Sequence, residues 1–355
     1  MLPAMTVPIP LRASYDEAAR LERRSWHRAI AASALGAVQH GDPARILKGA
    51  WPRDERAATI LRSATAPADT TSAAALAPDL VDAFRSLAPG SAALRLFEAG
   101  LKIELTGVHS VKLPDVASWP PQPIFVAEGA PAPNLQWGFT GTVIGPTRKI
   151  LVIAATSGEL ENATPETASA VIGRVLADAT TKSLDTIAFG TQADDGVTPA
   201  GLLHGATPIT AATAGVDAMS EDLGALTGAI GAAGIDATGS VFVAGPREAT
   251  IMRVKVGPRF DSPILTTLGL PAKTVACFAP AALASGYRDA PQIETSREAS
   301  YHEESSPAQI VAPGGAVAAP VRSVFQTNVI AIRVRARAAW AVAQGGAQVV
   351  ANVNW

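Results

Sequence analysis

The chain has 355 residues, a formal net charge of −2, and 48% hydrophobic against 17% charged residues. This balance is enough to build a substantial core and excludes wholesale disorder. The 30 glycines and 27 prolines follow no short period, which excludes a collagen-like or other fibrous repeat. A net charge near zero argues against a dedicated reader of nucleic-acid sequence. The charge is uneven, however, because residues 1–63 carry ten basic and six acidic side chains, and the remainder carries 19 and 25.

Cys277 is the only cysteine, which excludes an intrachain disulfide and a cysteine-based zinc site and fits a reducing compartment. The first residues, MLPAMTVPIPLR, lack a basic region followed by a long apolar run, so no secretion signal is expected. Apolar stretches elsewhere are interrupted by Gly, Pro or charge and are too short for a membrane span. The sequence therefore indicates a soluble protein.

The first third of the chain predicts helices followed by extended segments. A capping-box pattern at Ser14–Glu17 predicts a helix to about Val38, which Gly41-Asp42-Pro43 ends. Further expected segments are a short helix over 52–62, a linker over 63–77 and an amphipathic helix over 78–97. Residues 101–155 form extended segments around a proline-rich middle at 114–133, which indicates a long two-limbed β excursion with an irregular tip.

The strongest helix signal begins at Thr164-Pro165-Glu166, where Thr can cap and Pro suits the first helical position. Apolar spacing predicts one buried stripe and an end near Phe189-Gly190; the stripe comprises Ala168, Val171, Ile172, Val175, Leu176 and Ala179. Later segments are a helix over 220–235, a strand over 241–244, a short helix after Gly245-Pro246, an excursion over 298–320, and closing strands on either side of Gln344-Gly345-Gly346. Helices and strands do not alternate regularly, so the expected class is α+β.

Motifs for chemistry are incomplete. Gly36 to Gly41 has the glycine spacing of a phosphate loop but lacks the following Lys-Ser/Thr, and His302-Glu303 lacks the second histidine of a zinc motif. No G-x-S-x-G elbow occurs. Asp194-Asp195 are candidate paired carboxylates but are also ordinary in an exposed loop, and the sequon Asn162-Ala163-Thr164 is better explained as a helix cap. The sequence predicts no catalytic, cofactor-binding or metal-binding residue.

Five stretches, in this order, resemble the tailed-phage major capsid proteins, the family with the Hong Kong 97-type fold. They are FVAEGAPAP at 125–133; the strand-forming 139–155 with SGEL at 157–160; the long helix from Pro165; AFG at 188–190 with PAGLL at 199–203; and FQTN at 325–328 continuing to WAV at 340–342. The resemblance covers about residues 66–355. It implies a peripheral domain with a long spine helix and a β-sheet, an axial domain, an extended β-hairpin loop and a helical N-terminal arm.

The resemblance also implies domain boundaries. The expected segments are 1–65, a helical, scaffold-like N-terminal arm; 66–104, the start of the peripheral domain; 105–148, the extended loop; 149–204, the peripheral domain with the spine helix; 205–297, the axial domain; 298–320, an insertion; 321–345, the peripheral-domain strand; and 346–355, a C-terminal tail to the axial domain.

The function implied by the resemblance is that of a non-catalytic major capsid protein. Such a subunit self-assembles into pentamers and hexamers of an icosahedral shell around the double-stranded DNA of a tailed phage, prophage or gene-transfer particle. Its partners would be copies of itself, a portal, a scaffold or protease, decoration proteins and non-specifically bound DNA, with no cofactor and no membrane. The expected location is the virion, assembled in the bacterial host cytoplasm. Two alternatives stay open: an encapsulin-like nanocompartment shell, and an enzyme of unknown chemistry.

The chain departs from the family pattern in two places. In the founding member, a loop lysine is joined to an asparagine with help from a glutamate. Asn328 falls at the asparagine position, but Arg335 falls at the glutamate position and no lysine occurs between Lys112 and Lys149. We therefore expect no autocatalytic crosslink. The front segment of about 65 residues is expected to be a retained arm or a short internal scaffold, whose net charge of +4 over 1–63 either faces DNA or belongs to a solvated helix pair.

Overall fold

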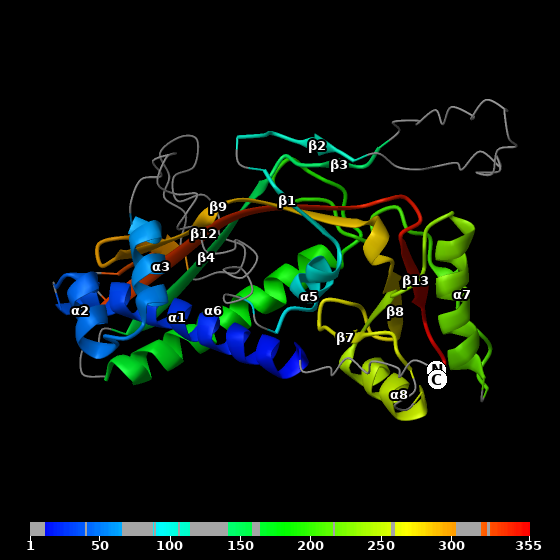
Figure 1. The fold of residues 1–355 in the computed structure, drawn as a ribbon, viewed down its shortest axis with the longest axis horizontal. Coiled ribbons are helices and arrows are strands. Elements are labelled where there is room, and N and C mark those ends of the chain that lie inside the picture. The colour runs from blue at the N-terminus through cyan, green and yellow to red at the C-terminus, as the bar shows by residue number, and fades with distance from the viewer. Residues whose placement is uncertain are drawn as a thin grey trace, which may run out of the picture. The chain divides into compact units, whose positions relative to one another are not determined.

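A computed structural model describes most of the chain (Figure 1). The described residues are 11–39, 41–65, 88, 90–105, 107–113, 141–157, 164–215, 217–256, 260–302, 321–324 and 327–355. Most of the expected linker over 63–77 lies outside them, and its first residues, 63–65, belong instead to the helix Glu55–Thr65. The proline-rich tip at 114–133 also lies outside them, as do most of the expected helix over 78–97 and most of the 298–320 excursion. The mixture of helices and sheets confirms the α+β class.

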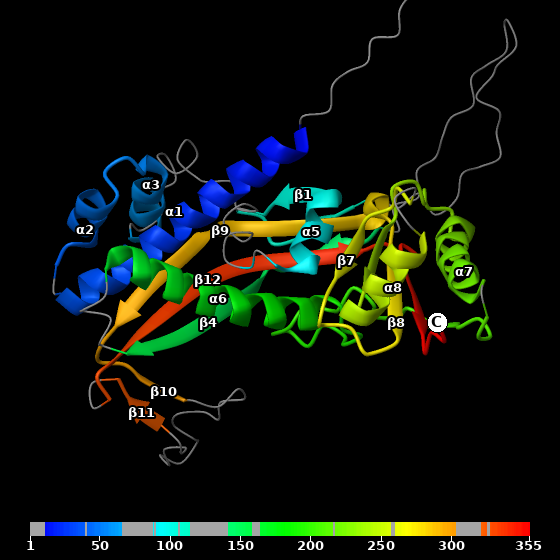
Figure 2. The ribbon, with the colours of Figure 1, turned by 90° about the horizontal axis from the view of Figure 1, so that it is seen from below.

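The chain divides into two compact units. Unit 1 comprises residues 1–90, 150–181 and 289–336, and unit 2 comprises 91–149, 182–288 and 337–355. One sheet has the strand order β1-β9-β12-β4, with strands Leu101–Glu104, Leu283–Ser296, Val329–Val342 and Arg148–Ser157 (Figure 2). The long strands β9 and β12 and the helix α6 (Pro165–Ala188) each contribute residues to both units.

Three helices open unit 1: α1 (Leu11–Gln39), α2 (Pro43–Ala50) and α3 (Glu55–Thr65). The predicted break after α1 is confirmed, because Asp42 caps α2 by accepting a hydrogen bond from the Ala44 amide at 3.0 Å and Pro43 occupies the first turn. Helix α2 itself was not predicted, and α3 begins at Glu55 rather than at residue 52 because Asp54 caps it. Helix α1 begins three residues before the predicted cap Ser14, since Leu, Arg and Ala all favour helix.

The core of unit 1 lies between these helices, α6 and the strands. Trp26, Ile30 and Leu35 of α1 are fully or almost fully buried, and they belong to one cluster with Ile172 of α6 and Ile332 of β12. Val152 and Ala154 of β4 pack against the same cluster. A short antiparallel pair, β10 (Ser300–His302) and β11 (Val321–Ser323), completes the described part of this unit.

Unit 2 contains a five-stranded sheet with the order β5-β13-β8-β6-β7. Its strands are Ile209–Thr210, Ala347–Ala351, Thr274–Phe278, Val241–Ala244 and Ile264–Thr266; its helices are α7 (Ala218–Ala232) and α8 (Pro246–Val256). Every residue of β6 and β8 is buried, as expected for short apolar strands at the centre of a sheet covered by helices. The predicted strand over 241–244 is confirmed, as is the helix after Gly245-Pro246.

The remaining elements of unit 2 are α5 (Ala92–Ala99), a short 3-10 turn at Pro280–Ala282, and an antiparallel pair of β2 (Val111–Lys112) and β3 (Val143–Ile144). Ser91 caps α5 by accepting a hydrogen bond from the Leu94 amide. The turn between β12 and β13 contains Gly345 with φ +87°, a conformation that favours glycine. The predicted closing strands and their turn are therefore confirmed.

Candidate assembly elements and a basic pocket

Helix α6 is the predicted spine, and its start is confirmed. The Thr167 amide donates to Thr164 Oγ1 at 3.3 Å, and Pro165 is the first helical residue. The predicted buried stripe is partly wrong: Ala168, Ile172 and Leu176 are buried, but Val171 is 47% exposed and Ala179 is also exposed. The buried face of α6 also includes small and polar residues, namely Ser169, Gly173, Ala177, Thr180 and Ala188.

Strand β4 presents two different faces in unit 1. Val152 and Ala154 pack against the core, whereas Leu151 and Ile153 are 42% and 51% exposed. Alternate residues of a strand point to opposite sides of the sheet, so the two exposed side chains share the outer face. That face of β4 is apolar and uncovered within the part of the chain that the structure describes.

The base of the β2–β3 excursion is anchored in unit 2. Leu105 and Ile144 are fully buried, and they pack with Ala284 and Ala339. A Cβ at Gly286 would lie 2.5 Å from Leu105 Cδ1 and 3.1 Å from Ile144 Cγ2, so a larger residue there would displace these two side chains. Farther from the anchor, Val108 and Val143 are 44% and 52% exposed. The described limbs of the excursion therefore keep apolar side chains on the surface.

One face of β12 carries Arg333 and Arg335, which alternate with the buried Ile332 and Val334. Arg333 pairs with Glu294 of β9, and Arg335 donates to Gln292 of the same strand. Asn328 occupies a left-handed turn, with φ +48°, just before β12. The position expected for a catalytic glutamate thus holds a guanidinium hydrogen-bonded to an amide.

Asp185 of α6 is a buried polar centre of unit 2 that sequence reasoning missed. Its carboxylate accepts hydrogen bonds from Ser91 Oγ at 2.5 Å and Thr267 Oγ1 at 2.7 Å. It also accepts from the amides of Ala92 and Ala93, both at 3.1 Å, at the start of α5. A carboxylate at a helix N-terminus satisfies amides that have no partner within the helix. One side chain thereby joins three segments that are far apart in sequence.

The candidate pair Asp194-Asp195 does not form a shared acid–base site. Asp194 pairs with Arg148 at 2.5 Å. Asp195 accepts from the amides of Thr198 and Val197, and these two hydrogen bonds lower its pKa. Two carboxylates sharing a proton would show one raised pKa instead. The pair shapes a turn, which agrees with the structural alternative weighed from sequence.

Other candidate sites give no cluster of chemical groups. The described residues include no group of three His, Cys, Asp or Glu side chains placed to hold a metal ion. Burial raises the pKa of the Cys277 thiol to about 12, against a smaller lowering by a hydrogen bond with Ser240. Thr164 of the sequon caps α6, as predicted. Among the helices that the structure describes, none is long and apolar enough to cross a membrane.

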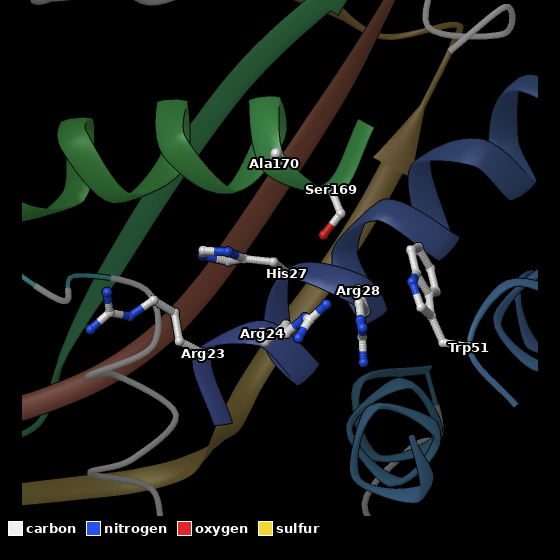
Figure 3. A pocket seen from close by; sticks show the side chains of 7 residues that line it. All are labelled: Arg23, Arg24, His27, Arg28, Trp51, Ser169 and Ala170. Carbon is white, nitrogen blue, oxygen red and sulfur yellow. The ribbon is translucent and has the colours of Figure 1, made fainter. Parts of the chain in front are cut away.

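A basic pocket lies in unit 1 between the opening helices and α6 (Figure 3). It has a volume of about 390 Å³ and is lined by Arg23, Arg24, His27 and Arg28 of α1, Trp51 after α2, and Ser169 and Ala170 of α6. Arg28 pairs with Asp54 at 2.7 Å, and its guanidinium carbon lies 5.5 Å from the centre of the Trp51 ring. No local sequence pattern indicates this pocket, because its three sides come from segments that are far apart in the chain.

The elements correspond to those expected from the sequence resemblance: a long helix packed against a sheet, a second sheet with helices, a two-stranded excursion and a helical arm. The arrangement agrees with the elements that the sequence resemblance implies. No family model matches the chain, and no curated protein matches it.

Solved structures similar to the chain come from phages and a GTA particle. One from Microbacterium phage Oxtober96 has 18% identity and a TM-score of 0.48, covering 74% of this chain and 91% of that one. One from Mycobacterium phage Adephagia has 16% identity and a TM-score of 0.47, covering 83% and 98%. The capsid of an empty GTA particle has 13% identity and a TM-score of 0.48, covering 74% and 90%.

Proposed function

We propose that the chain is a major capsid protein, which self-assembles into the pentamers and hexamers of an icosahedral shell around the double-stranded DNA of a tailed phage, prophage or gene-transfer particle. The observation that carries this proposal is the apolar surface left exposed on otherwise well-packed elements. In unit 1 it comprises Leu151 and Ile153 of β4, and in unit 2 Val108 and Val143 of the excursion. Apolar surface that neighbouring copies cover stabilises an assembly by about 25 cal/mol per Å² removed from water.

The two exposed surfaces differ from each other. One is the outer face of a strand in a long sheet, and the other lies along a thin two-stranded limb with few residues of its own to pack against. A contact between unlike surfaces is heterologous, and heterologous contacts that close produce rings. Rings of five and six subunits are the units from which an icosahedral shell is built. The geometry thus supports a shell subunit better than a dimer with one self-complementary patch.

Within this proposal the predicted segments take structural roles. Residues 149–204 and 321–345 form the peripheral domain, 205–297 with the tail 346–355 form the axial domain, and 105–148 form the loop that lies over a neighbour. Partners are copies of the chain, a portal, a scaffold or protease, decoration proteins and the packaged DNA. The location is the virion after assembly in the host cytoplasm. No step of catalysis is assigned to any residue.

The test is the size and shape of what the full chain forms when it is expressed with the genes that flank its own. Light scattering on a sizing column, followed by negative-stain microscopy, should show closed polyhedral particles or rings of five and six. Double-stranded DNA inside the particles agrees with the proposal, whereas an enclosed enzyme contradicts its viral part. A monomer at every concentration and salt, with and without the flanking genes, overturns it.

Two variants at one position make this test specific. Ile153→Asp places a charge on the exposed face of β4 and should abolish particles while circular dichroism stays unchanged. Ile153→Val keeps an apolar side chain of similar shape and should assemble like the natural sequence. Particles formed equally well by both variants would show that this face is not covered in the shell.

A further inference from the structure

The basic pocket of unit 1 is lined by hydrogen-bond donors from three directions (Figure 3). Arginine side chains of α1 form one side, Trp51 a second, and the Ser169 hydroxyl of α6 a third. The nearby carboxylate of Asp54 is already engaged by Arg28 and by Ser25 Oγ at 2.8 Å. Arg24 is exposed and adds a further positive charge at the pocket. The pocket therefore offers excess positive charge and several donors.

The indole of Trp51 supplies an independent indication of a ligand. Trp51 is only 6% exposed, and its Nε1 has no hydrogen-bond partner among the described residues. Figure 3 shows this nitrogen on the edge of the ring that faces the other pocket side chains. A buried N–H group that lacks an acceptor is unfavourable, so such groups usually meet one in the functional state. An oxyanion in the pocket would provide that acceptor.

The packing of the helices holds the pocket in shape before any ligand binds. Asp54 caps α3 through the Ala57 amide at 2.9 Å while its other oxygen binds Arg28. Helix α1 approaches α6 closely, because a Cβ on Gly173 would lie 2.6 Å from Cγ of His27. Fixed donors bind an anion better than mobile ones, since less conformational freedom is lost on binding.

The exposed charges of the three helices that open unit 1 are mostly positive. Over residues 21–62, among those whose exposure is described, the exposed acids are Asp42 and Glu55, and the exposed cations are Arg24, Arg45, Lys48, Arg53, Arg56 and Arg62. A polyanion that placed one charge in the pocket would meet further cations on this surface. A single small anion would use the pocket alone.

We propose that the pocket binds phosphate and that its ligand is a backbone phosphate of duplex DNA. This inference rests on the proposed function, in which the shell encloses DNA. A phosphate presents oxygens in several directions and so matches donors on three sides, whereas a carboxylate presents two oxygens in one plane. The surrounding cations favour a phosphate that is part of a chain over a free one. The contact reads no base sequence, because it is made to the backbone.

The experiment measures binding of a fluorescent 20-base-pair duplex to the full chain by anisotropy, over a series of salt concentrations. Trp51→Phe removes the indole N–H together with the five-membered ring that carries it, and should weaken binding about tenfold, the loss expected for one hydrogen bond to a charged group. The matched control is Trp26→Phe: the Trp26 Nε1 also lacks a partner among the described residues, but that ring is fully buried and does not line the pocket. This control should leave the affinity unchanged.

Arg24→Gln should weaken binding and reduce the slope of log affinity against log salt by about one, as expected for one phosphate contact. Inorganic phosphate and poly-glutamate are added as competitors to separate the possible sources of the anion. If Trp51→Phe weakens inorganic phosphate binding but not duplex binding, the DNA assignment is wrong. If it weakens poly-glutamate binding but not duplex binding, an acidic protein segment is the ligand and the proposal fails.

Failure of the shell proposal gives a different result from failure of the pocket proposal. The anisotropy measurement does not require assembly, so an unassembled chain that binds duplex through Trp51 would support the pocket and contradict the shell. Particles that form normally but bind duplex equally with and without the Trp51 N–H would support the shell and overturn the pocket.

Discussion

The buried carboxylate of Asp185 accepts four hydrogen bonds from segments that are far apart in the sequence. Its side chain accepts from two hydroxyls and two amides, and the residue is only 3% exposed. Removing an acceptor of this kind leaves several buried donors without partners, and each such loss is costly. Asp185→Ala should therefore lower the free energy of unfolding by about 3 kcal/mol, measured by urea denaturation of the unassembled chain.

The control for Asp185 is Asp178, which lies earlier in the same helix, α6. Asp178 is exposed, and its ion pair with Arg174 spans 3.9 Å with both side chains largely in solvent. Asp178→Ala should change the free energy of unfolding by less than about 0.5 kcal/mol. Equal losses for the two variants would mean that the hydrogen bonds at Asp185 contribute nothing specific.

Asp54 gives the helical arm a dependence on pH. Burial disfavours its charged form, but hydrogen bonds from Arg28 and the Ala57 amide outweigh that effect and lower its pKa below the usual value. A carboxyl with a lowered pKa in the folded state stabilises it above the unfolded pKa, and this contribution disappears as the pH falls through the folded pKa. Stability that Asp54 provides near neutral pH should therefore be lost in acid.

The measurement for Asp54 compares urea midpoints of the natural chain and Asp54→Asn between pH 7 and pH 3. At pH 7 the variant should be less stable by about 1–2 kcal/mol, because it loses a charge-assisted hydrogen bond and a helix cap. The difference should shrink towards pH 3. A difference that stays constant with pH would show that ionisation of Asp54 has no part in holding the arm.

The pocket could not have been predicted from sequence. The arginines at 23, 24 and 28 are ordinary on a solvated helix, and Trp51 and Ser169 are remote from them in the chain. Asp185 was missed for a related reason, since its four donors come from residues 91–93 and 267. Both clusters form only through tertiary contacts, so the spacing of residues within one segment does not indicate either of them.

At the scale of single elements, the crossing of α1 and α6 depends on Gly173. An added Cβ there would approach the His27 ring, with 2.7 Å to Cε1. In an exposed helix, Gly→Ala usually stabilises by about 0.5–1 kcal/mol, but here the ring must be displaced at a cost of about 1–3 kcal/mol. Gly173→Ala should therefore lower the free energy of unfolding by about 1 kcal/mol.

The matched control for Gly173 is Gly228→Ala in α7. Gly228 is exposed, and no atom lies within 4 Å of the Cβ that alanine would add. This variant should raise the thermal midpoint while Gly173→Ala lowers it. A rise in both midpoints would show that α1 and α6 are not in close contact at Gly173.

The buried thiol of Cys277 can report whether the five-stranded sheet unfolds locally. Burial raises the pKa of the Cys277 thiol to about 12, and the residue is fully buried at the centre of β8. Only the thiolate reacts with disulfide reagents. The folded chain should therefore not react with Ellman's reagent at pH 8 and should release one equivalent of chromophore in 6 M guanidinium chloride. Rapid reaction without denaturant would show that the sheet opens.

Sequence patterns predicted where helices and strands lie better than they predicted which face of a helix is buried. The start of α6 followed from Thr164 and Pro165, and β6 followed from a short apolar run between loop residues. The buried face of α6 was predicted only in part, because the spacing of apolar residues does not detect the buried Ser169, Gly173 and Thr180. Small residues allow close helix contact, and their role is visible only when the opposing helix is in place.

At the scale of the whole molecule, the guanidinium at position 335 argues against a covalent shell. It donates to Gln292 and cannot accept a proton, so it cannot act as the base that the crosslink of the founding family member uses. Assembled particles boiled in SDS and reductant should run as a single band of monomer. A ladder of higher bands would show that another residue assists the bond or that a different bond forms.

The division into two units limits which segments of the gene can be exchanged or truncated without disrupting a unit. Of the five boundaries, the one at 90/91 precedes α5, whereas those at 149/150, 181/182, 288/289 and 336/337 fall inside β4, α6, β9 and β12. Neither unit is encoded by one uninterrupted stretch of gene, so recombination cannot exchange one as a cassette, and a truncated transcript yields neither. A homologue that changed only one unit would have to do so by scattered point substitutions. Neither unit can therefore be expressed or exchanged as one continuous segment.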